Sequence, residues 1–270
     1  MRRITGDGVE LNVRDEGEGQ AVLLLHGFPD SARLWRHQIP TLLDAGFRVV
    51  APDQRGFGDS DKPQEIAACG FGHLVSDMLA VLDDAGVEKA HVVGHDWGAA
   101  VAWALAILAP ERVDRLAVLS VGHPTAFGAR GIEQRRLSWY MLLFQFEEAE
   151  ALLRKDDWAL MREWAASHPD LDQAIEDLSR PGALTAALNW YRASLHPRGE
   201  LSERGALPLV RADTLGVFST GDAFLLEDQM TGSGPHIAGR WRYERIEDAG
   251  HWLQLEQPER INALLLDFLR

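Results

Sequence analysis

Short apolar runs with the length of buried strands alternate with helix-like segments over much of this 270-residue chain. The first clear run spans Val22–Leu25, a second covers Arg48–Ala51, and similar runs end near Gly94 and Ser120. Strands that are apolar at every position are buried on both faces, and helices between such strands cover both faces of a parallel sheet. The alternation therefore predicts an α/β fold with a mostly parallel central sheet flanked by helices.

The alternation stops after Pro124 and resumes near residue 208. Between residues 125 and 207, helical segments rich in Trp, Leu, Phe and Arg replace the strands, as in "RRLSWYMLLFQFEEAEALL". Strand-like "TLGVFSTGD" and "RWRYERIE" follow, and "PERINALLLDFL" predicts a closing amphipathic helix with a proline near its start. We therefore expect a sheet domain formed by residues 1–124 and 208–270, with a helical cap inserted at residues 125–207.

The composition is that of an ordinary soluble globular protein, with 46% apolar and 25% charged residues. A formal net charge of −14 argues against nucleic acid as a partner, because such binding depends on basic patches. The single cysteine, Cys69, allows neither an intrachain disulfide nor a thiolate metal cluster. No apolar run approaches the roughly 20 residues that span a bilayer, and the N-terminus lacks the apolar centre of a signal peptide. We expect a cytoplasmic enzyme or binding protein, with no membrane span.

The stretch "VVGHDWGAAVAW" resembles the GxSxG nucleophile elbow, with Asp96 in the place of the serine. An apolar strand precedes Asp96 and an alanine-rich helix follows it, so its side chain is expected at the carboxyl edge of the sheet. Aspartate also caps many helices, which is the structural alternative for this residue. The flanking Gly94 and Gly98, and the lack of a GxSxG motif elsewhere in the sequence, favour a nucleophile.

Two further residues complete a catalytic triad in the chain order nucleophile, acid, histidine. His251 follows the strand around residues 241–246 and precedes the last helix, which places it at the same sheet edge as Asp96. Asp222 ends the preceding strand "TLGVFSTGD", whereas "SVGHPT" after the earlier strand offers no carboxylate. We therefore predict His251 as the base and Asp222 as its acid partner.

The loop "LLLHGFPDS" follows the first buried strand, and in this architecture it supplies one backbone N–H of an oxyanion hole. The residue after the nucleophile supplies the other N–H. These positions are Phe28 and Trp97. His26, in the same loop, is interpreted as a structural hydrogen-bonding residue.

An aspartate nucleophile indicates a substrate with a leaving group on a saturated carbon. The carboxylate is ionised at neutral pH, so it displaces directly and forms an ester, which water activated by His251 then hydrolyses. A halide leaving group needs N–H donors such as indoles, whereas an epoxide oxygen needs an acidic O–H donor such as tyrosine. Two of the three tyrosines, Tyr140 and Tyr191, lie in the helical insertion, where simple packing is the alternative reading.

The motifs "HGFPD", "GHDWGA", "SWYMLLFQF", "NWYRASL", "STGDAFLLEDQM" and "AGHWLQLEQPE" resemble, in this order, those of α/β-hydrolase-fold epoxide hydrolases. The resemblance covers essentially the whole chain and implies the α/β-hydrolase fold with a cap. It also implies that Tyr140 and Tyr191 bind and protonate the epoxide oxygen, and that no metal or organic cofactor is needed. The expected partners are a small apolar epoxide and water, and the chain could form a homo-oligomer. The residues expected to contact the substrate are Phe28, Trp97, Trp139, Leu143 and Phe144.

The nearest alternative is a haloalkane dehalogenase, to which "GHDWG" and the triad are equally similar. That family often has an asparagine where this chain has Phe28, although a tryptophan could replace it as a halide donor. The candidates for that replacement are Trp139, Trp158, Trp164 and Trp190. Fluoroacetate dehalogenases carry an arginine after the nucleophile, where this chain has Trp97. A non-catalytic hydrolase-fold ligand receptor is the third reading, but every catalytic position is filled here.

Overall fold

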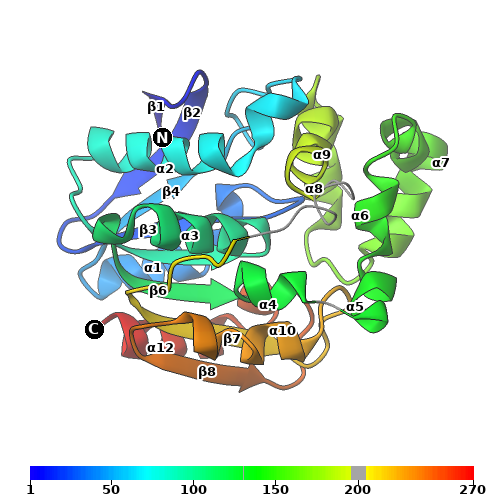
Figure 1. Ribbon diagram of the computed structural model, residues 1–270. Coiled ribbons are helices and arrows are strands. Elements are labelled where there is room, and N and C mark those ends of the chain that lie inside the picture. Colours follow the sequence, from blue (N-terminus) through cyan, green and yellow to red (C-terminus); the bar gives the residue numbers. More distant parts are fainter. Residues whose placement is uncertain (130, 196–204) are drawn as a thin grey trace.

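The computed structural model describes residues 1–129, 131–195 and 205–270. Within these ranges one eight-stranded sheet has the order β1-β2-β4-β3-β5-β6-β7-β8 (Figure 1). The strands are β1 (Arg2–Thr5), β2 (Glu10–Glu16), β3 (Ala21–Leu25), β4 (Arg48–Pro52), β5 (Ala90–His95), β6 (Val113–Leu119), β7 (Asp213–Ser219) and β8 (Trp241–Ile246). Strands β1 and β2 pair antiparallel, β2 pairs antiparallel with β4, and all other neighbours are parallel. The prediction of a mostly parallel sheet is confirmed.

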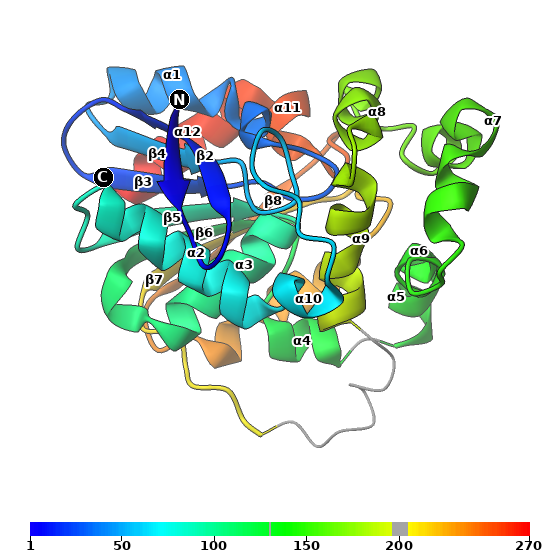
Figure 2. The ribbon, with the colours of Figure 1, turned by 90° about the horizontal axis from the view of Figure 1, so that it is seen from above.

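Helices cover both faces of the sheet, as Figure 2 shows from above. One face carries α1 (Gln38–Asp44), α11 (Leu253–Glu256) and α12 (Pro258–Leu269). The other carries α2 (Phe71–Asp84), α3 (Trp97–Leu108) and α10 (Glu227–Thr231). Because of this double cover every residue of the central strands β3 and β5 is buried, which explains the unbroken apolar character of β3. Short 3-10 turns lie at Ala32–Trp35, Ile66–Cys69, Pro110–Arg112 and Gly234–His236.

Six helices follow β6 and lead back toward β7 in the described part of this connection. They are α4 (Pro124–Gly128), α5 (Ile132–Leu137), α6 (Trp139–Leu143), α7 (Ala149–Trp164), α8 (Leu171–Ser179) and α9 (Ala183–Ser194). Helix α7 is kinked, with non-helical backbone angles at residues 155–158. Helices α6 to α9 stand beyond the carboxyl ends of the parallel strands (Figures 1 and 2). The helical insertion thus faces the sheet edge where the candidate residues were expected. None of the described helices is both long and apolar enough to cross a membrane.

Candidate active site

Asp96 occupies a tight turn between β5 and α3, with φ of 52° and ψ of −122°. This backbone conformation is strained for a residue other than glycine, and such strain is typical of functional sites. The turn also needs the two glycines around it. A Cβ on Gly98 would lie 2.0 Å from the carbonyl oxygen of Leu25, and one on Gly94 would lie 2.3 Å from the carbonyl oxygen of Gly98. The strand–turn–helix predicted around Asp96 is therefore present, and the glycines make it sterically possible.

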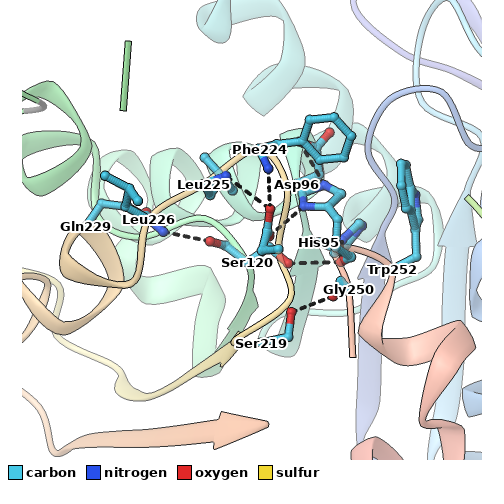
Figure 3. A network of polar contacts seen from close by, with 12 residues as sticks. His95, Asp96, Ser120, Ser219, Phe224, Leu225, Leu226, Gln229, Gly250 and Trp252 are labelled. Carbon is cyan, nitrogen blue, oxygen red and sulfur yellow. Dashed lines mark hydrogen bonds and ion pairs between the residues drawn. The ribbon is translucent and has the colours of Figure 1, made fainter. Parts of the chain in front are cut away.

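The structure brings Asp96, His251 and Asp222 together from the ends of three strands. The Nδ1 atom of His251 lies 2.8 Å from Oδ2 of Asp222, and its Nε2 atom lies 3.6 Å from Oδ2 of Asp96. The other oxygen of Asp222 accepts hydrogen bonds from the amides of Phe224 and Leu225, at 2.8 and 3.0 Å (Figure 3). The carboxylate of Asp222 is thereby fixed with one oxygen directed at the imidazole.

The loop that carries His251 is held by side chains from neighbouring strand ends. The carbonyl oxygen of His251 accepts hydrogen bonds from Nε2 of His95, at 2.9 Å, and from Oγ of Ser120, at 3.2 Å. Ser219 donates to the carbonyl oxygen of Gly250 (Figure 3). These anchors were not found from the sequence, because their acceptors are backbone carbonyls that leave no residue pattern.

Burial and charge together set the protonation of the neighbouring histidines His95 and His251, whose ring centroids lie 4.7 Å apart. Burial disfavours the charged form of His251, but the carboxylates of Asp222 and Asp96 outweigh it and raise the pKa of His251 to about 10. Burial, together with the charge of His251, lowers the pKa of His95 to about 4. His95 is therefore neutral at pH 7, and its proton lies on Nε2, where it is donated to the His251 carbonyl.

The two backbone positions predicted for an oxyanion hole lie beside Asp96. The amide of Phe28 donates to Oδ1 of Asp96 at 2.9 Å. Trp97 is the first residue of α3, so its N–H is among those that a helix leaves without an internal acceptor. His26 accepts a hydrogen bond from the amide of Gln54 on Nε2, at 3.0 Å, and its Nδ1 lies 3.0 Å from the next carbonyl oxygen. Both ring nitrogens of His26 are thus used to hold the loop, as expected for a structural residue.

Tyr140 of α6 and Tyr191 of α9 are both buried, and their ring centroids lie 6.1 Å apart. Burial, and then the negative charge of Asp96, raises the pKa of both phenols well above 10. Both hydroxyl groups therefore keep their protons at neutral pH. The Tyr191 ring also stands edge-on to the indole of Trp97, with centroids 5.0 Å apart. The insertion thus contributes two protonated phenols close to the carboxylate at the sheet edge.

A pocket lies against Asp96 and Tyr140. Most of its lining is apolar and comes from segments that are distant in the sequence, namely Phe71, Ala100, Val121, Phe127, Met141 and Leu195. Apolar walls around a few polar groups are typical of small-molecule sites. Within the described residues, no group of three or more His, Cys, Asp or Glu side chains could hold a metal ion.

The pocket lining differs from the set of contact residues expected from the sequence. Of the five, Trp97 lines the pocket. The lining does not include Phe28, Trp139, Leu143 or Phe144. Trp139 is 45% exposed, because the short helix α6 turns this side chain outward. Phe144 is buried against the tyrosines, with its ring centroid 5.5 Å from Tyr140 and 4.9 Å from Tyr191.

The chain is similar in sequence and in structure to several known proteins. The model of the alpha/beta hydrolase fold family matches residues 20–258. Epoxide hydrolase A of Mycobacterium tuberculosis is 36% identical, over 99% of this chain and 96% of that protein. The crystal structure of epoxide hydrolase A from Mycobacterium thermoresistibile is 35% identical with a TM-score of 0.84, covering 100% of this chain and 97% of that one. The epoxide hydrolase of Bacillus megaterium, solved in complex with an inhibitor, is 26% identical with a TM-score of 0.90, covering 99% of both chains.

Proposed function

The chain belongs to the alpha/beta hydrolase fold family, and from this premise we propose that it is an epoxide hydrolase, which opens an epoxide to a vicinal diol. The observation that carries the proposal is the pair of buried, protonated phenols of Tyr140 and Tyr191 near the carboxylate of Asp96. An epoxide oxygen needs such O–H donors, whereas a halide leaving group does not. The names of the related proteins support the same activity.

In the first half-reaction, the carboxylate of Asp96 attacks a saturated carbon of the epoxide. A carbon–oxygen bond forms on the enzyme, and the strained ring bond breaks with its electron pair going to the epoxide oxygen. Tyr140 and Tyr191 hold this oxygen and supply the proton that makes it a hydroxyl group. The product is an ester of Asp96, and the enzyme's nucleophile has lost its charge.

In the second half-reaction, His251 activates water against the ester carbonyl. Esterification removes the negative charge of Asp96, one of the causes that raise the pKa of His251, so the imidazole releases its proton more readily than in the free enzyme. This proton restores the phenol that was deprotonated in the first half-reaction, and the neutral imidazole then accepts a proton from the attacking water. Asp222 keeps the ring oriented through Nδ1. The amides of Phe28 and Trp97 stabilise the oxyanion of the tetrahedral intermediate, which then releases the diol and regenerates Asp96.

The proposal assigns separate tasks to two parts of the chain. The sheet domain of residues 1–124 and 208–270 carries the nucleophile, the base and the acid, and the cap of residues 125–207 carries the two phenols. The substrate is held where the two parts meet. The apolar lining of the pocket there supports a lipophilic epoxide as the substrate, with water as the second reactant.

One observation favours haloalkane dehalogenation as the second candidate. The indole nitrogen of Trp164 is buried without a hydrogen-bond partner among the described residues, and its ring centroid lies 4.7 Å from that of Tyr140. Trp164 could therefore join Trp97 as a halide donor. Two of the other candidates are less suitable, since Trp139 is exposed and Trp190 already donates to the carbonyl oxygen of Arg55.

A paired assay distinguishes an epoxide hydrolase from a haloalkane dehalogenase and from a ligand receptor. The purified protein is given styrene oxide and 1-bromohexane in parallel, and diol and bromide are measured, with Asp96→Ala as the inactive variant and Asp44→Ala, at an exposed carboxylate, as its matched control. We expect diol without bromide, lost only in Asp96→Ala. Bromide without diol would establish the dehalogenase, and neither product, with binding of the epoxide retained, would establish a ligand receptor.

A further inference from the structure

The pocket beside Asp96 lies at the carboxyl ends of the strands, toward one face of the sheet. It is lined there by Phe71 at the start of α2, Ala100 of α3, Phe127 of α4 and Leu195 after α9. Helices α2 and α3 belong to the same face of the sheet, as Figure 2 shows. An apolar substituent on an epoxide carbon held at Asp96 has room on this side, which we call the open side.

Four packed rings occupy the other side of the site, and we call them the aromatic wall. They are Phe28, Trp164, Phe224 and Trp252. None of the four is among the residues that line the pocket. Phe28 precedes the first 3-10 turn and Trp252 directly precedes α11, and α11 lies on the face of the sheet opposite to α2 and α3 (Figure 2).

The aromatic wall is closed by ring contacts along its length. Trp164 lies 6.1 Å from Phe28 and 5.2 Å from Phe224, measured between ring centroids. Phe224 lies 5.7 Å from Trp252 and 5.1 Å from the ring of His251. Phe224 and Trp252 are both drawn in Figure 3. Rings at these distances are in van der Waals contact, so a further side group enters only by displacing them.

We propose that the site selects terminal epoxides, which carry one apolar substituent on one ring carbon. The proposal rests on the proposed function, since it places the epoxide oxygen at Tyr140 and Tyr191 and a ring carbon at Asp96. With these atoms fixed, the single substituent occupies the open side. A 1,2-disubstituted epoxide has a second group on the other carbon, and that group meets the aromatic wall.

The test uses two isomers of the same composition and one small reference substrate. These are 1,2-epoxyhexane, trans-2,3-epoxyhexane and 1,2-epoxypropane, and diol formation gives kcat/KM for each. We expect 1,2-epoxyhexane to be preferred over its isomer on the order of 10- to 100-fold, because forcing an additional group into a packed wall is costly. Equal rates for the isomers, or preference for the 2,3-epoxide, would overturn the inference.

Variants show whether the aromatic wall is the cause. Trp164→Ala and the milder Phe224→Leu are expected to raise the relative rate on trans-2,3-epoxyhexane about tenfold. Leu195→Phe, on the open side, is expected to slow 1,2-epoxyhexane while sparing 1,2-epoxypropane. Trp158→Ala removes a buried tryptophan outside the aromatic wall and should leave the preference unchanged. If neither wall variant relaxes the preference, the inference is wrong.

Failure of the inference and failure of the proposed function give different results. A protein that hydrolyses 1,2-epoxypropane and treats the two hexene-derived epoxides alike remains an epoxide hydrolase with another substrate range. A folded protein that hydrolyses none of the three epoxides removes the function on which the inference rests, and overturns both.

Discussion

At the scale of single residues, the charge of Asp96 controls the protonation state of the neighbouring His251. The imidazole of His251 lies between two carboxylates and is protonated in the free protein at neutral pH, since its pKa is raised to about 10. A protonated imidazole is no base, so the proposed mechanism requires Asp96 to lose its charge first. Ester formation removes this charge, so His251 becomes able to act as a base only after the first step is complete.

Replacing His251 by glutamine tests this coupling. The variant should still form the ester but hydrolyse it at least about 100-fold more slowly, since general-base assistance is worth roughly that much or more. Mass spectrometry of the intact protein after mixing with styrene oxide should show an added mass of one epoxide molecule. His37→Gln, at an exposed histidine, is the control and should not accumulate the adduct. Sustained turnover by His251→Gln would contradict the role of the histidine.

At the scale of elements, the turn between β5 and α3 depends on glycine at a point of close contact. Gly98→Ala should lower the free energy of unfolding by about 1 to 3 kcal/mol, because the added Cβ meets the carbonyl oxygen of Leu25 and either the strand or the helix must shift. Urea denaturation gives the value. Gly72→Ala is the control, since Gly72 is an exposed residue of α2 and no atom of the described residues lies within 4 Å of its Cβ position. There we expect stabilisation by about 0.5 to 1 kcal/mol. Equal effects of the two substitutions would show that the contact at Gly98 is unimportant.

The sequence predicted elements best where the pattern was local. The turn at Asp96 is flanked by a short apolar strand and an alanine-rich helix, so its place was evident from adjacent residues alone. The outward direction of the Trp139 side chain was not evident from the sequence. Helix α6 has only five residues, and a helix that short has no periodicity to reveal its buried face. Phe71 and Phe127 could not be assigned to the pocket, since only the tertiary fold brings α2 and α4 to Asp96.

At the scale of the whole molecule, one buried cluster fastens the insertion to the sheet domain. Nε2 of His168, from the connection between α7 and α8, lies 3.2 Å from one oxygen of Asp30. The other oxygen accepts a hydrogen bond from the indole of Trp252 at 3.0 Å. Burial alone would raise the pKa of Asp30, but the charge and hydrogen bond of His168 outweigh it and lower that pKa. The stabilisation from this contact is therefore present at neutral pH and is lost as the pH falls below the ordinary aspartate range.

His168→Ala should reduce the free energy of unfolding by about 3 kcal/mol at pH 7, because it leaves the buried carboxylate of Asp30 without its strongest partner. The loss should shrink in acid, where Asp30 is protonated in both forms. Denaturation of the variant and of His37→Ala at pH 7 and at low pH measures both effects. A difference between the variants that does not depend on pH would argue that His168 acts by packing alone.

The place where the insertion leaves and rejoins the sheet has a consequence for how this architecture can diverge. Strands β6 and β7 are parallel neighbours, with Arg115 paired to Asp213 and Leu119 to Val217, so the long connection leaves the carboxyl end of one strand and returns to the amino end of the strand beside it. The entropic cost of closing such a connection rises only with the logarithm of its length, by about 0.6 kcal/mol for each doubling. Descendants of the chain can therefore lengthen, shorten or replace this connection at little cost to the sheet, and change the range of molecules admitted while inheriting the nucleophile and its base intact.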